Sequence, residues 1–498
     1  MSNAAAKPAE TPSPSVPIWS VALLLLAALL IRGAVLWAWF DRLSADPDGY
    51  RDIAEALCYS GIYGRYSEDA QWYRENGFLG ANAEPNPTAF RPPFYPFVLS
   101  KVTMETRVSN LAVALLHLGL GVATVWVTWL LGHWMKLGWG SLVAAGLVAI
   151  DPVLLHQSAL VMTETLATFL AAVALLCWWR YGDQPSLWRA GLFGASLALA
   201  MLCRPTFGAM IGISAIAVAW RGETWGQRIG YLATFVVGAA MVLAPWATRN
   251  WLVMGRPIFG TTHGGYTVYL GNNKHFYDHL RSDPYRPFGL EENLRDWPSA
   301  FKKNRVAEDL RVRTIQVLAR GFPRPSPNGQ GVVYTIPSIS EADGTVELEL
   351  AADQAANELA WGAMIDRPGD FFLASVYRVS RLWGWLPLQT HAEESDAGLA
   401  LRWSVAAYYA CLFATIAFTL WRLGRDAFSS PWLGIVLLCS AFTLVHTFYW
   451  TDLRMRAPLM PGLALLAAQG GLFLWQWWSG ADENRPAIVA SDTAAAVD

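Results

Sequence analysis

Long apolar stretches constrain the fold of this chain more than any other feature of its sequence. A helix needs about 20 mostly apolar residues to cross a bilayer. Because lipid offers the backbone no hydrogen bonds, only helices and closed barrels can cross it. The segments that approach or reach this length are residues 18–40, 111–135, 140–155, 161–180, 187–203, 207–220, 229–245, 403–421, 432–450 and 459–478. The sequence therefore predicts an all-α polytopic membrane protein with about ten transmembrane helices.

The composition agrees with this prediction. Charged residues make up only 15% of the chain and hydrophobic residues 54%, whereas a soluble domain carries about 25% charged residues. Many of the 26 tryptophans lie near the ends of the apolar segments, where membrane interfaces favour amphipathic rings. The net charge of -2 gives no sign of a nucleic-acid partner. We therefore expect membrane lipids, and no nucleic acid, around this protein.

Positive charge in the short loops predicts the orientation of the helices, because cytoplasmic loops are enriched in Lys and Arg. With the N-terminus inside, every short cytoplasmic loop holds at least one of these residues. These loops are 136–139, 180–189, 221–228 and 422–432. The short loop on the opposite side, residues 151–158, holds none. We therefore expect the two large loops to lie outside the cytoplasm.

These boundaries divide the chain into five expected parts. Both ends are rich in small residues typical of disordered tails. The first apolar segment lacks a clear cleavage site and is interpreted as a retained signal anchor. The parts are a disordered cytoplasmic tail (1–17), a transmembrane module (18–245) that includes the first outer loop (41–110), a second extracytoplasmic loop (246–401), C-terminal transmembrane helices (402–479) and a second disordered cytoplasmic tail (480–498).

The second large loop has predicted structure of its own. Residues 304–318 and 353–365 have helical patterns. Residues 331–337 and 344–350 alternate apolar and polar side chains, and the turn between them predicts a small β-hairpin. The apolar stretch 371–387 contains two arginines and is expected to form helices on the membrane surface, not a span.

The first large loop opens with two carboxylates. Asp46, Asp48 and Tyr50 lie just before an amphipathic helical pattern. Either carboxylate could cap that helix, and spacing alone favours this interpretation. A carboxylate near a membrane surface can also be a general base that takes a proton from an attacking hydroxyl.

The same loop closes with a proline-rich segment around Arg91 and Tyr95. Three prolines within five residues stiffen this backbone. Arg91 is thereby held near the start of the next membrane segment, where a guanidinium can bind phosphate. An interfacial arginine that reaches lipid headgroups is an equally good interpretation.

Glu164 lies just inside a predicted membrane segment, where carboxylates are costly and tend to face functional cavities. It could instead cap the helix beside the N-terminal dipole. Four arginines also lie at predicted outer edges of membrane segments, namely Arg204, Arg249, Arg454 and Arg456. Such clustering departs from the usual charge bias. An anionic ligand in the outer leaflet explains the set, although headgroup anchoring explains any single arginine.

The start of the second large loop is rich in Gly and Asn turns, which allow close approach of the backbone to a ligand. Polar side chains in this region are Asn250, His263, Tyr266, Asn272, Asn273 and Lys274. His263 alone is more typical of a structural hydrogen-bonding residue than of a metal ligand. The sequence has no zinc-protease, P-loop, nucleophile-elbow or dinucleotide-binding motif. Its five cysteines have no metal-site spacing.

The ordered set of these residues resembles the polyprenyl-phosphate-dependent glycosyltransferases of the GT-C fold. This group includes protein O-mannosyltransferases and aminoarabinose transferases, and the resemblance is to its broad bacterial family-39-like branch. Each motif alone is weak, but their order against the predicted spans covers most of the chain. The motifs are Asp46…Tyr50…Ala54, Arg91-Pro92-Pro93-Phe94-Tyr95-Pro96, Thr163-Glu164, Arg204-Pro205, Pro245-Trp246…Arg249-Asn250, Gly265-Tyr266…Gly271-Asn272-Asn273 and Arg454…Arg456…Pro458.

The resemblance implies roles for these residues. The implied catalytic residues are three: Asp46 takes the position of the base, Asp48 is a second carboxylate that could share or take this role, and Glu164 is the acid of the fourth span. Arg91 takes the position that contacts the donor phosphate. The full implied substrate-binding set is Tyr50, Arg91, Tyr95, Arg204, Arg249, Asn250, His263, Tyr266, Asn272, Asn273, Lys274, Arg454 and Arg456. Gly49 stands where aminoarabinose transferases tend to carry Arg, which argues against lipid A as the acceptor.

The function implied by the resemblance is transfer of a hexosyl or pentosyl group from a polyprenyl-phosphate donor to a hydroxyl acceptor on protein, lipid or polysaccharide. The reaction is expected to be inverting and to take place on the outer side of the cytoplasmic (inner) membrane. It requires no cofactor, and a divalent metal remains an open alternative. Two other classes stay open: a transporter or flippase for a lipid-linked anionic glycan, and an O-antigen ligase or polymerase. The absence of an internal repeat weighs against the transporter.

Overall fold

The structure is a computed structural model that describes residues 16–46, 48–66, 84–103, 107–282, 305–320, 322–325, 332–335, 345–387 and 395–479. The described chain is mostly helical, and the strands in it form two small antiparallel pairs. One pair, β1 (Gly64–Arg65) with β2 (Asn86–Pro87), lies in the first large loop. The predicted all-α class is therefore confirmed.

In the part of the chain that the structure describes, six helices are long and apolar enough to cross a membrane. They are α1 (Ile18–Ala38), α5 (Asn110–Trp134), α8 (Glu164–Asp183), α11 (Trp225–Met254), α18 (Asp396–Leu423, with η3, Gly424–Phe428) and α20 (Met460–Trp478, with η4, Leu453–Leu459). A pair bent by 48°, α6 (Gly140–Ile150) and α7 (Pro152–Ser158), could form a seventh. Three shorter apolar helices are α9 (Leu187–Met201), α10 (Phe207–Trp220) and α19 (Leu433–His446). The chain is a multi-pass membrane protein, and the count of ten spans stays a prediction.

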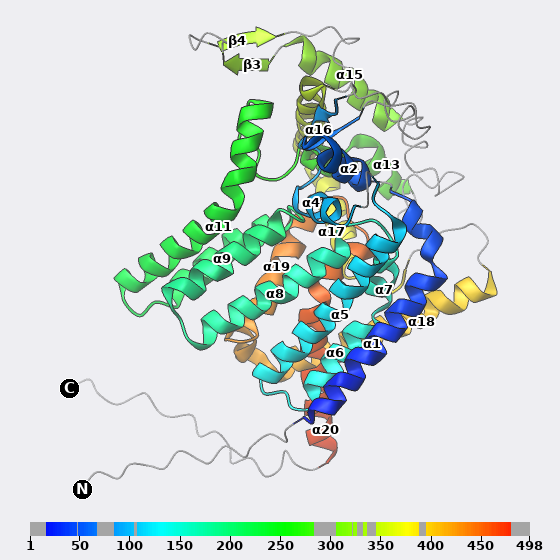
Figure 1. Cartoon of the computed structure of the whole chain (residues 1–498), viewed down its shortest axis with the longest axis vertical. Coiled ribbons are helices and arrows are strands. Elements are labelled where there is room, and N and C mark those ends of the chain that lie inside the picture. The colour runs from blue at the N-terminus through cyan, green and yellow to red at the C-terminus, as the bar shows by residue number, and fades with distance from the viewer. Residues whose placement is uncertain are drawn as a thin grey trace.

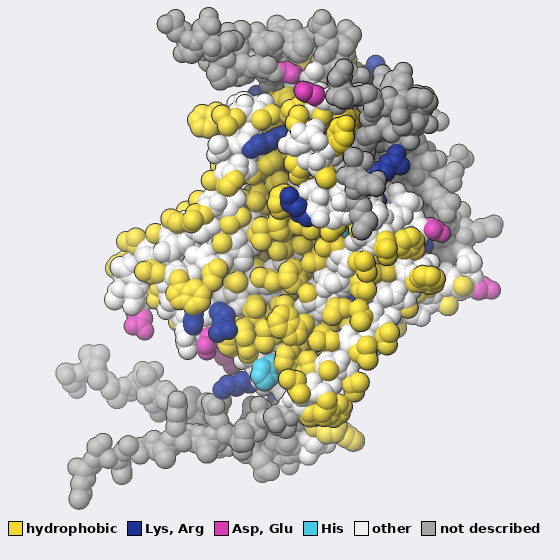
Figure 2. Space-filling view, in the orientation of Figure 1, with side chains coloured by type: hydrophobic (Ala, Val, Ile, Leu, Met, Phe, Trp, Pro, Cys, Tyr) yellow, Lys and Arg dark blue, Asp and Glu magenta, His cyan; other side chains and the backbone are white. Residues whose placement is uncertain are grey.

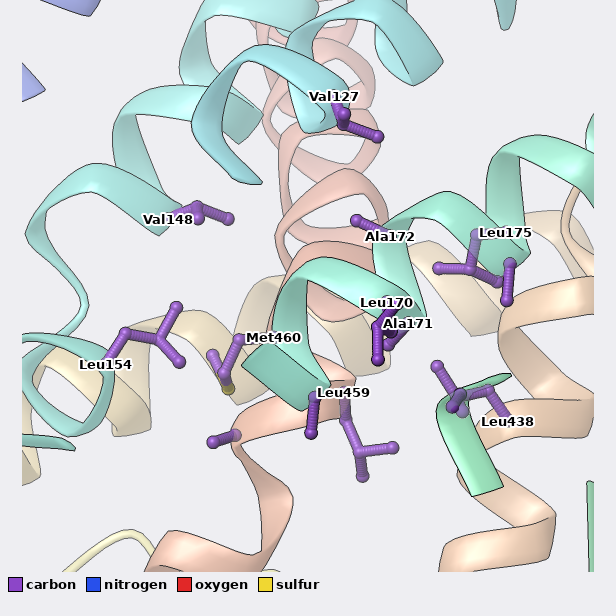
Figure 3. Close-up of a cluster of buried hydrophobic side chains, with 14 of the residues drawn as sticks. Val127, Val148, Leu154, Leu170, Ala171, Ala172, Leu175, Leu438, Leu459 and Met460 are labelled. Carbon is purple, nitrogen blue, oxygen red and sulfur yellow. The ribbon is translucent and has the colours of Figure 1, made fainter. Parts of the chain in front are cut away.

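The helices pack around α20, whose residues 460–468 are all buried. Figure 3 shows side chains from several helices meeting beside it, among them Val148, Leu154, Leu170, Leu438 and Met460. Hydrophobic side chains cover the middle of the face seen in Figure 2, and most of the visible charged ones lie toward its ends. This distribution suits a body that crosses a bilayer.

Helices α9 and α11 approach each other closely through glycines. A Cβ atom at Gly194 would lie 2.1 Å from the carbonyl oxygen of Phe235, and one at Gly238 would lie 2.1 Å from that of Gly191. Small residues at such positions let helix backbones touch, which is a common basis of helix packing in membranes.

The two large loops fold together at one end of the bundle, opposite the start of α1 and the end of α20 (Figure 1). The first loop contributes η1 (Phe40–Ser44), α2 (Tyr50–Ser60) and α4 (Phe94–Lys101). The second contributes α12 (Gly264–Gly271), α13 (Lys274–Ser282), α15 (Arg305–Ala319), α16 (Val346–Asp366) and α17 (Pro368–Leu382). The helices predicted at 304–318 and 353–365 are thus confirmed as α15 and α16.

The small hairpin of the second loop is present, but one of its predicted strands was wrong. Strand β4 (Val332–Thr335) pairs with β3 (Phe322–Pro325), not with residues 344–350. Residues 346–350 instead begin α16, because the Thr345 hydroxyl accepts the N–H of Leu348 as an N-cap and two glutamates lie in the first turn. Acidic side chains stabilise a helix N-terminus, and this outweighs a short alternating pattern.

Two predicted boundaries also change. The span predicted to end at Pro245 continues as α11 to Met254, where Gly255 ends it with a φ of +70°. Proline removes only one backbone donor, and helices in membranes tolerate that loss. Residues 151–158, predicted as a short loop, form α7, because Pro152 occupies the first turn and the Asp151 carboxylate accepts the N–H of Leu154 at 2.9 Å.

Candidate functional site

Helix α2 is fixed to the start of α5 by polar contacts at the end of the bundle. Arg51 donates to the side chain of Asn110 at 2.7 Å and also to the carbonyls of Val108 and Leu43. The N–H of Val108 donates to the Glu55 carboxylate at 2.9 Å. These contacts set the position of the loop that precedes α2 and carries the two predicted carboxylates.

Asp46 caps α2, which is the simpler of the two interpretations that the sequence allowed. Its carboxylate accepts the backbone N–H of Tyr50 at 3.0 Å and that of Arg51 at 2.6 Å. Burial raises the pKa of Asp46 to about 6, against the lowering effect of these two donors. A carboxylate has about four lone-pair sites, so two remain. Asp46 is therefore both a cap and a carboxyl group that exchanges its proton near neutral pH.

Asp48 is paired with Arg91. The Arg91 Nη2 atom lies 2.8 Å from Asp48 Oδ1, and Arg91 Nε donates to the Asp48 carbonyl at 2.9 Å. The guanidinium also lies over the rings of Phe90 and Tyr50, 4.6 and 5.4 Å from their centroids. Tyr50 in turn packs edge-on against Tyr95, with 5.2 Å between ring centroids. The proline-rich segment thus holds Arg91 at the start of α2.

Glu164 forms a second charged group at the N-terminus of α8. It is 1% exposed, and its Oε1 lies 3.1 Å from Arg204 Nη1 and 3.8 Å from Arg454 Nε. Arg454 also pairs with Asp452 at 3.1 Å. No side-chain cap bond is found at Thr163, the residue before α8. Glu164 therefore faces the two arginines from the first turn of α8, where its charge also suits the helix N-terminus.

Two buried tyrosines join these charged groups into one cluster. Burial raises the pKa of Tyr50, which also lies in the fields of Arg91, Asp48, Glu164 and Arg204. Burial likewise raises the pKa of Tyr95, which lies in the fields of Asp46, Tyr50 and Glu164. The cluster, called the polar cluster below, comprises Asp46, Asp48, Tyr50, Arg91, Tyr95, Glu164, Arg204 and Arg454.

His263 and Tyr266 lie on the Arg91 side of the polar cluster. The His263 ring packs edge-on against Phe90, 4.5 Å between centroids, and at a tilt against Tyr266, 4.9 Å away. Burial, and then the charges of Arg91 and Arg65, lower the pKa of His263 well below its usual value. Its imidazole is therefore neutral. Among the described residues its Nδ1 has no hydrogen-bond partner.

Arg249 and Asn250 serve the protein's own structure. Arg249 lies on the extension of α11 beyond Pro245 and donates to the carbonyls of Thr88 at 2.8 Å and Tyr63 at 2.6 Å. Asn250 is fully buried and donates to the carbonyl of Ile258 at 2.8 Å. The pair ties the end of α11 to the first loop, and neither side chain is part of the polar cluster.

Four other predicted binding residues also contact the protein and lie outside the polar cluster: Asn272, Asn273, Lys274 and Arg456. Their partners are the Phe448 carbonyl (2.6 Å from Asn272 Nδ2), the Phe276 N–H (2.8 Å from Asn273 Oδ1), the Asp309 carboxylate (3.0 Å from Lys274 Nζ) and the Tyr409 ring (3.8 Å from the Arg456 guanidinium). Arg and Asn bond to carbonyls as readily as to ligands, so residue type alone did not separate these roles.

Sequence reasoning missed Glu349, which holds the two large loops together. Its carboxylate accepts the N–H of Ala89 at 2.8 Å and the hydroxyls of Thr88 and Thr262. One turn along α16, Asp353 accepts a backbone N–H of the segment that carries His263 and Tyr266, at 2.7 Å. Glu349 lies in the predicted second strand, so no sequence pattern indicated that it faces the first loop.

We expect Glu349→Leu to destabilise the protein. The change leaves three buried donors without an acceptor, and each unpaired group costs about 1–3 kcal/mol. A drop in the free energy of unfolding of about 3 kcal/mol or more is expected, measured by thermal unfolding of the purified protein in detergent. Glu349→Gln keeps one acceptor oxygen and should lose about half as much. If both variants were as stable as the wild type, Glu349 would not hold the two large loops together.

The polar cluster can neutralise an anion and accept a proton. Arg91 and Arg204 lie within electrostatic range of Tyr50, and so does Arg454. Guanidiniums bind phosphate oxygens in a bidentate manner. Among the residues that the structure describes, no three His, Cys, Asp or Glu side chains lie close enough together to hold a metal ion.

Part of the chain is similar to a known protein family. The family model for dolichyl-phosphate-mannose-protein mannosyltransferase matches residues 90–247, a segment that contains Arg91, Tyr95, Glu164 and Arg204. No curated protein matches the chain.

Two solved structures with low sequence identity are similar. One is the archaeal oligosaccharyltransferase AglB from Archaeoglobus fulgidus, in complex with an inhibitory peptide and a dolichol-phosphate. The sequence identity is 16% and the TM-score is 0.46, and the match covers 94% of this chain and 52% of that chain. The other is ArnT from Cupriavidus metallidurans bound to undecaprenyl phosphate. Its sequence identity is 15% and its TM-score is 0.38, and the match covers 94% of this chain and 80% of that chain. The chain thus spans about half the length of the oligosaccharyltransferase. The family match confirms, over residues 90–247, the resemblance to the GT-C glycosyltransferases that the sequence indicated.

Proposed function

We propose that this protein is an integral membrane glycosyltransferase that moves a sugar from a polyprenyl-phosphate donor to a hydroxyl acceptor. The observation that carries the proposal is the polar cluster, in which Asp46, with a pKa of about 6, shares a buried region with the guanidiniums of Arg91, Arg204 and Arg454. Such groups of perturbed acids and cations are typical of active sites. The family match adds a class of enzyme that uses a lipid-phosphate sugar.

The reaction follows from the chemistry of these groups. The arginines bind the donor phosphate and stabilise its charge as it leaves. Asp46 takes the proton of the acceptor hydroxyl. The acceptor oxygen attacks the anomeric carbon from the face opposite the phosphate, a new C–O bond forms, and the bond to the phosphate oxygen breaks. The products are an inverted glycoside, polyprenyl phosphate and protonated Asp46, which returns its proton to water.

Asp46 is a better candidate for the base than Asp48. A base needs a pKa near the working pH, and the pKa of about 6 meets this need. Asp48 is engaged with Arg91 at 2.8 Å, and proton uptake would break that ion pair. We therefore assign Asp48 to positioning Arg91, while Asp46 acts on the acceptor.

We infer that the polar cluster faces the outside of the inner membrane. It lies at the end of the bundle opposite the short loops 136–139, 180–189 and 221–228, each of which carries Lys or Arg. Positive loops favour the cytoplasm. A test is to place single cysteines in the loops at each end and measure their labelling by a membrane-impermeant reagent in intact cells.

The activity can be tested with the purified protein in lipid nanodiscs. A panel of polyprenyl-phosphate sugars is supplied with protein, lipid and polysaccharide acceptors, and release of polyprenyl phosphate is measured. The proposal predicts release that depends on both donor and acceptor. Movement of the intact donor across proteoliposome membranes without release would favour the transporter alternative.

The pH dependence of the reaction gives a separate prediction. Because Asp46 is a base only when deprotonated, kcat/KM should rise with pH through about 6 and be lost below that value. The charge of Asp48 contributes to raising the pKa of Asp46. In Asp48→Asn the midpoint should therefore move to lower pH. If kcat/KM stayed constant between about pH 4.5 and pH 8, the assignment of Asp46 as the base would be contradicted.

A further inference from the structure

A small cavity lies inside the bundle, one turn below Glu164. It is lined by residues from α1, α5, α7 and α8: Arg32, Gly121, Thr124, Leu154, Gln157, Thr165 and Thr168. Five of these side chains are polar or charged, although the cavity lies among membrane-crossing helices. Genuinely empty cavities in proteins are apolar. A cavity with polar side chains in its wall is therefore a candidate for a buried water.

Three side chains present unpaired polar atoms in this lining. Among the described residues, Arg32 Nε, Gln157 Oε1 and Thr165 Oγ1 are buried and have no hydrogen-bond partner. The side chains are nine-tenths or more buried, with exposed fractions of 2%, 4% and 6%. Buried polar groups in native proteins almost always have a partner. Three unpaired atoms in one cavity wall therefore point to a shared ligand.

Of the three side chains, Arg32 most requires a partner, because a guanidinium inside a membrane bundle is costly unless it is solvated or paired. Its Nη2 donates to the carbonyl of Val148 at 2.9 Å. The carboxylate of Asp151 attracts it electrostatically but bonds instead to the Leu154 N–H and the Tyr409 hydroxyl. The Nε atom of Arg32 has no hydrogen-bond partner among the described residues.

We propose that this cavity is a hydration site, in which an ordered water links α1, α7 and α8. The donors and acceptors balance around one water molecule. Arg32 Nε and the Thr165 hydroxyl donate to the water oxygen, and one water hydrogen is donated to Gln157 Oε1. Buried waters typically make about three such bonds, and the cavity is too small for an organic ligand.

The hydration site supports the helix turn that carries Glu164. Thr165 directly follows Glu164, and the hydroxyl of Thr168, also in the cavity wall, donates to the Glu164 carbonyl at 2.7 Å. The water thus fixes the first turn of α8 against Arg32 and Gln157. This positional role adds to the proposed function, but the hydration itself does not depend on it.

The sign of one stability change tests the proposal. If water fills the site, Thr165→Val removes one of its three partners and should lower the thermal unfolding midpoint by about 2 °C. If the cavity is dry, the same change removes an unsatisfied hydroxyl and adds apolar contact, so the midpoint should rise. A rise would overturn the proposal. Thermal unfolding needs no substrate, so failure here is distinct from failure of the proposed activity.

Ser214→Ala is the matched control. Ser214 on α10 is fully buried, its Oγ has no partner among the described residues, and it does not line the cavity. Removal of its hydroxyl should leave the midpoint unchanged or raise it. A drop as large as that of Thr165→Val would mean that loss of any buried hydroxyl is destabilising, and would overturn the interpretation.

A double-mutant cycle tests whether the partners share the same water. Gln157→Met and Thr165→Val should each lower the midpoint, and the double variant should lose less than the sum, because each change disrupts the same water. Fully additive losses would overturn the shared site. A high-resolution cryo-EM map of the wild type in nanodiscs should show density between Arg32, Gln157 and Thr165. Its absence in a map that shows other buried waters would also overturn it.

Discussion

Asp46→Asn is expected to lower kcat by about 10²–10⁴-fold, the usual contribution of a positioned general base. The amide of asparagine cannot take the acceptor proton. Its single oxygen can still accept one of the two N–H groups that Asp46 now accepts. Loss of the other cap bond costs about 1 kcal/mol of stability, which leaves the fold intact. Release of polyprenyl phosphate and thermal unfolding should be measured on the same preparation.

Asp48→Asn is the matched control for Asp46→Asn, because it makes the same chemical change two residues away. It weakens the contact between Arg91 and residue 48, now 2.8 Å, and so should raise KM for the donor more than it lowers kcat. Near-normal turnover in both variants would exclude Asp46 as the base. A large kcat loss in Asp48→Asn with little loss in Asp46→Asn would transfer the role to Asp48.

The helices could be predicted because membrane crossing demands long apolar segments. The failures have local causes. The predicted strand at 344–350 alternates correctly, but Thr345 caps a helix there, and alternation over a few residues cannot outweigh a cap followed by a long run of helix-favouring residues. The span predicted to end at Pro245 followed the end of the apolar segment, whereas α11 continues through more polar residues to Met254.

The candidate site was predictable in part. Asp46, Arg91, Glu164 and Arg204 come together because each lies beside the same end of a predicted membrane segment, and the positive-inside tendency made the arginines conspicuous. Arg249 and Arg456 have the same sequence signature but bond to backbone carbonyls. Glu349 gave no signal. The partner of a buried polar side chain depends on tertiary contacts, and these cannot be predicted from a single sequence.

Each arginine of the polar cluster is already paired with a carboxylate, and this has a consequence for donor binding. Arg91 pairs with Asp48, Arg204 with Glu164, and Arg454 with both Glu164 and Asp452. A donor phosphate must therefore share these guanidiniums with carboxylates. Each guanidinium has five N–H donors, so it can bind phosphate without releasing its carboxylate. The carboxylates keep the arginines aligned before the donor enters.

Glu164→Gln is accordingly expected to lower the free energy of unfolding by about 3 kcal/mol. Removal of one partner of a buried ion pair leaves the other charge uncompensated, at about 3–5 kcal/mol. The lower end applies because Arg454 keeps Asp452 as a partner and its side chain is 32% exposed. Thermal or denaturant unfolding in detergent measures the loss. The free energy of donor binding should change by less than the free energy of unfolding, because the guanidiniums of Arg204 and Arg454 both remain.

The double variant Glu164→Gln/Arg204→Met separates the two roles of this pair. Replacement of both members of a buried ion pair by uncharged groups is often close to neutral, so most of the stability lost in Glu164→Gln should return. Donor binding should not return, because one phosphate-binding guanidinium is gone. Recovery of both stability and turnover would mean that the pair is only structural and that the phosphate binds elsewhere. Recovery of neither would mean that Arg204 supports the fold independently of Glu164.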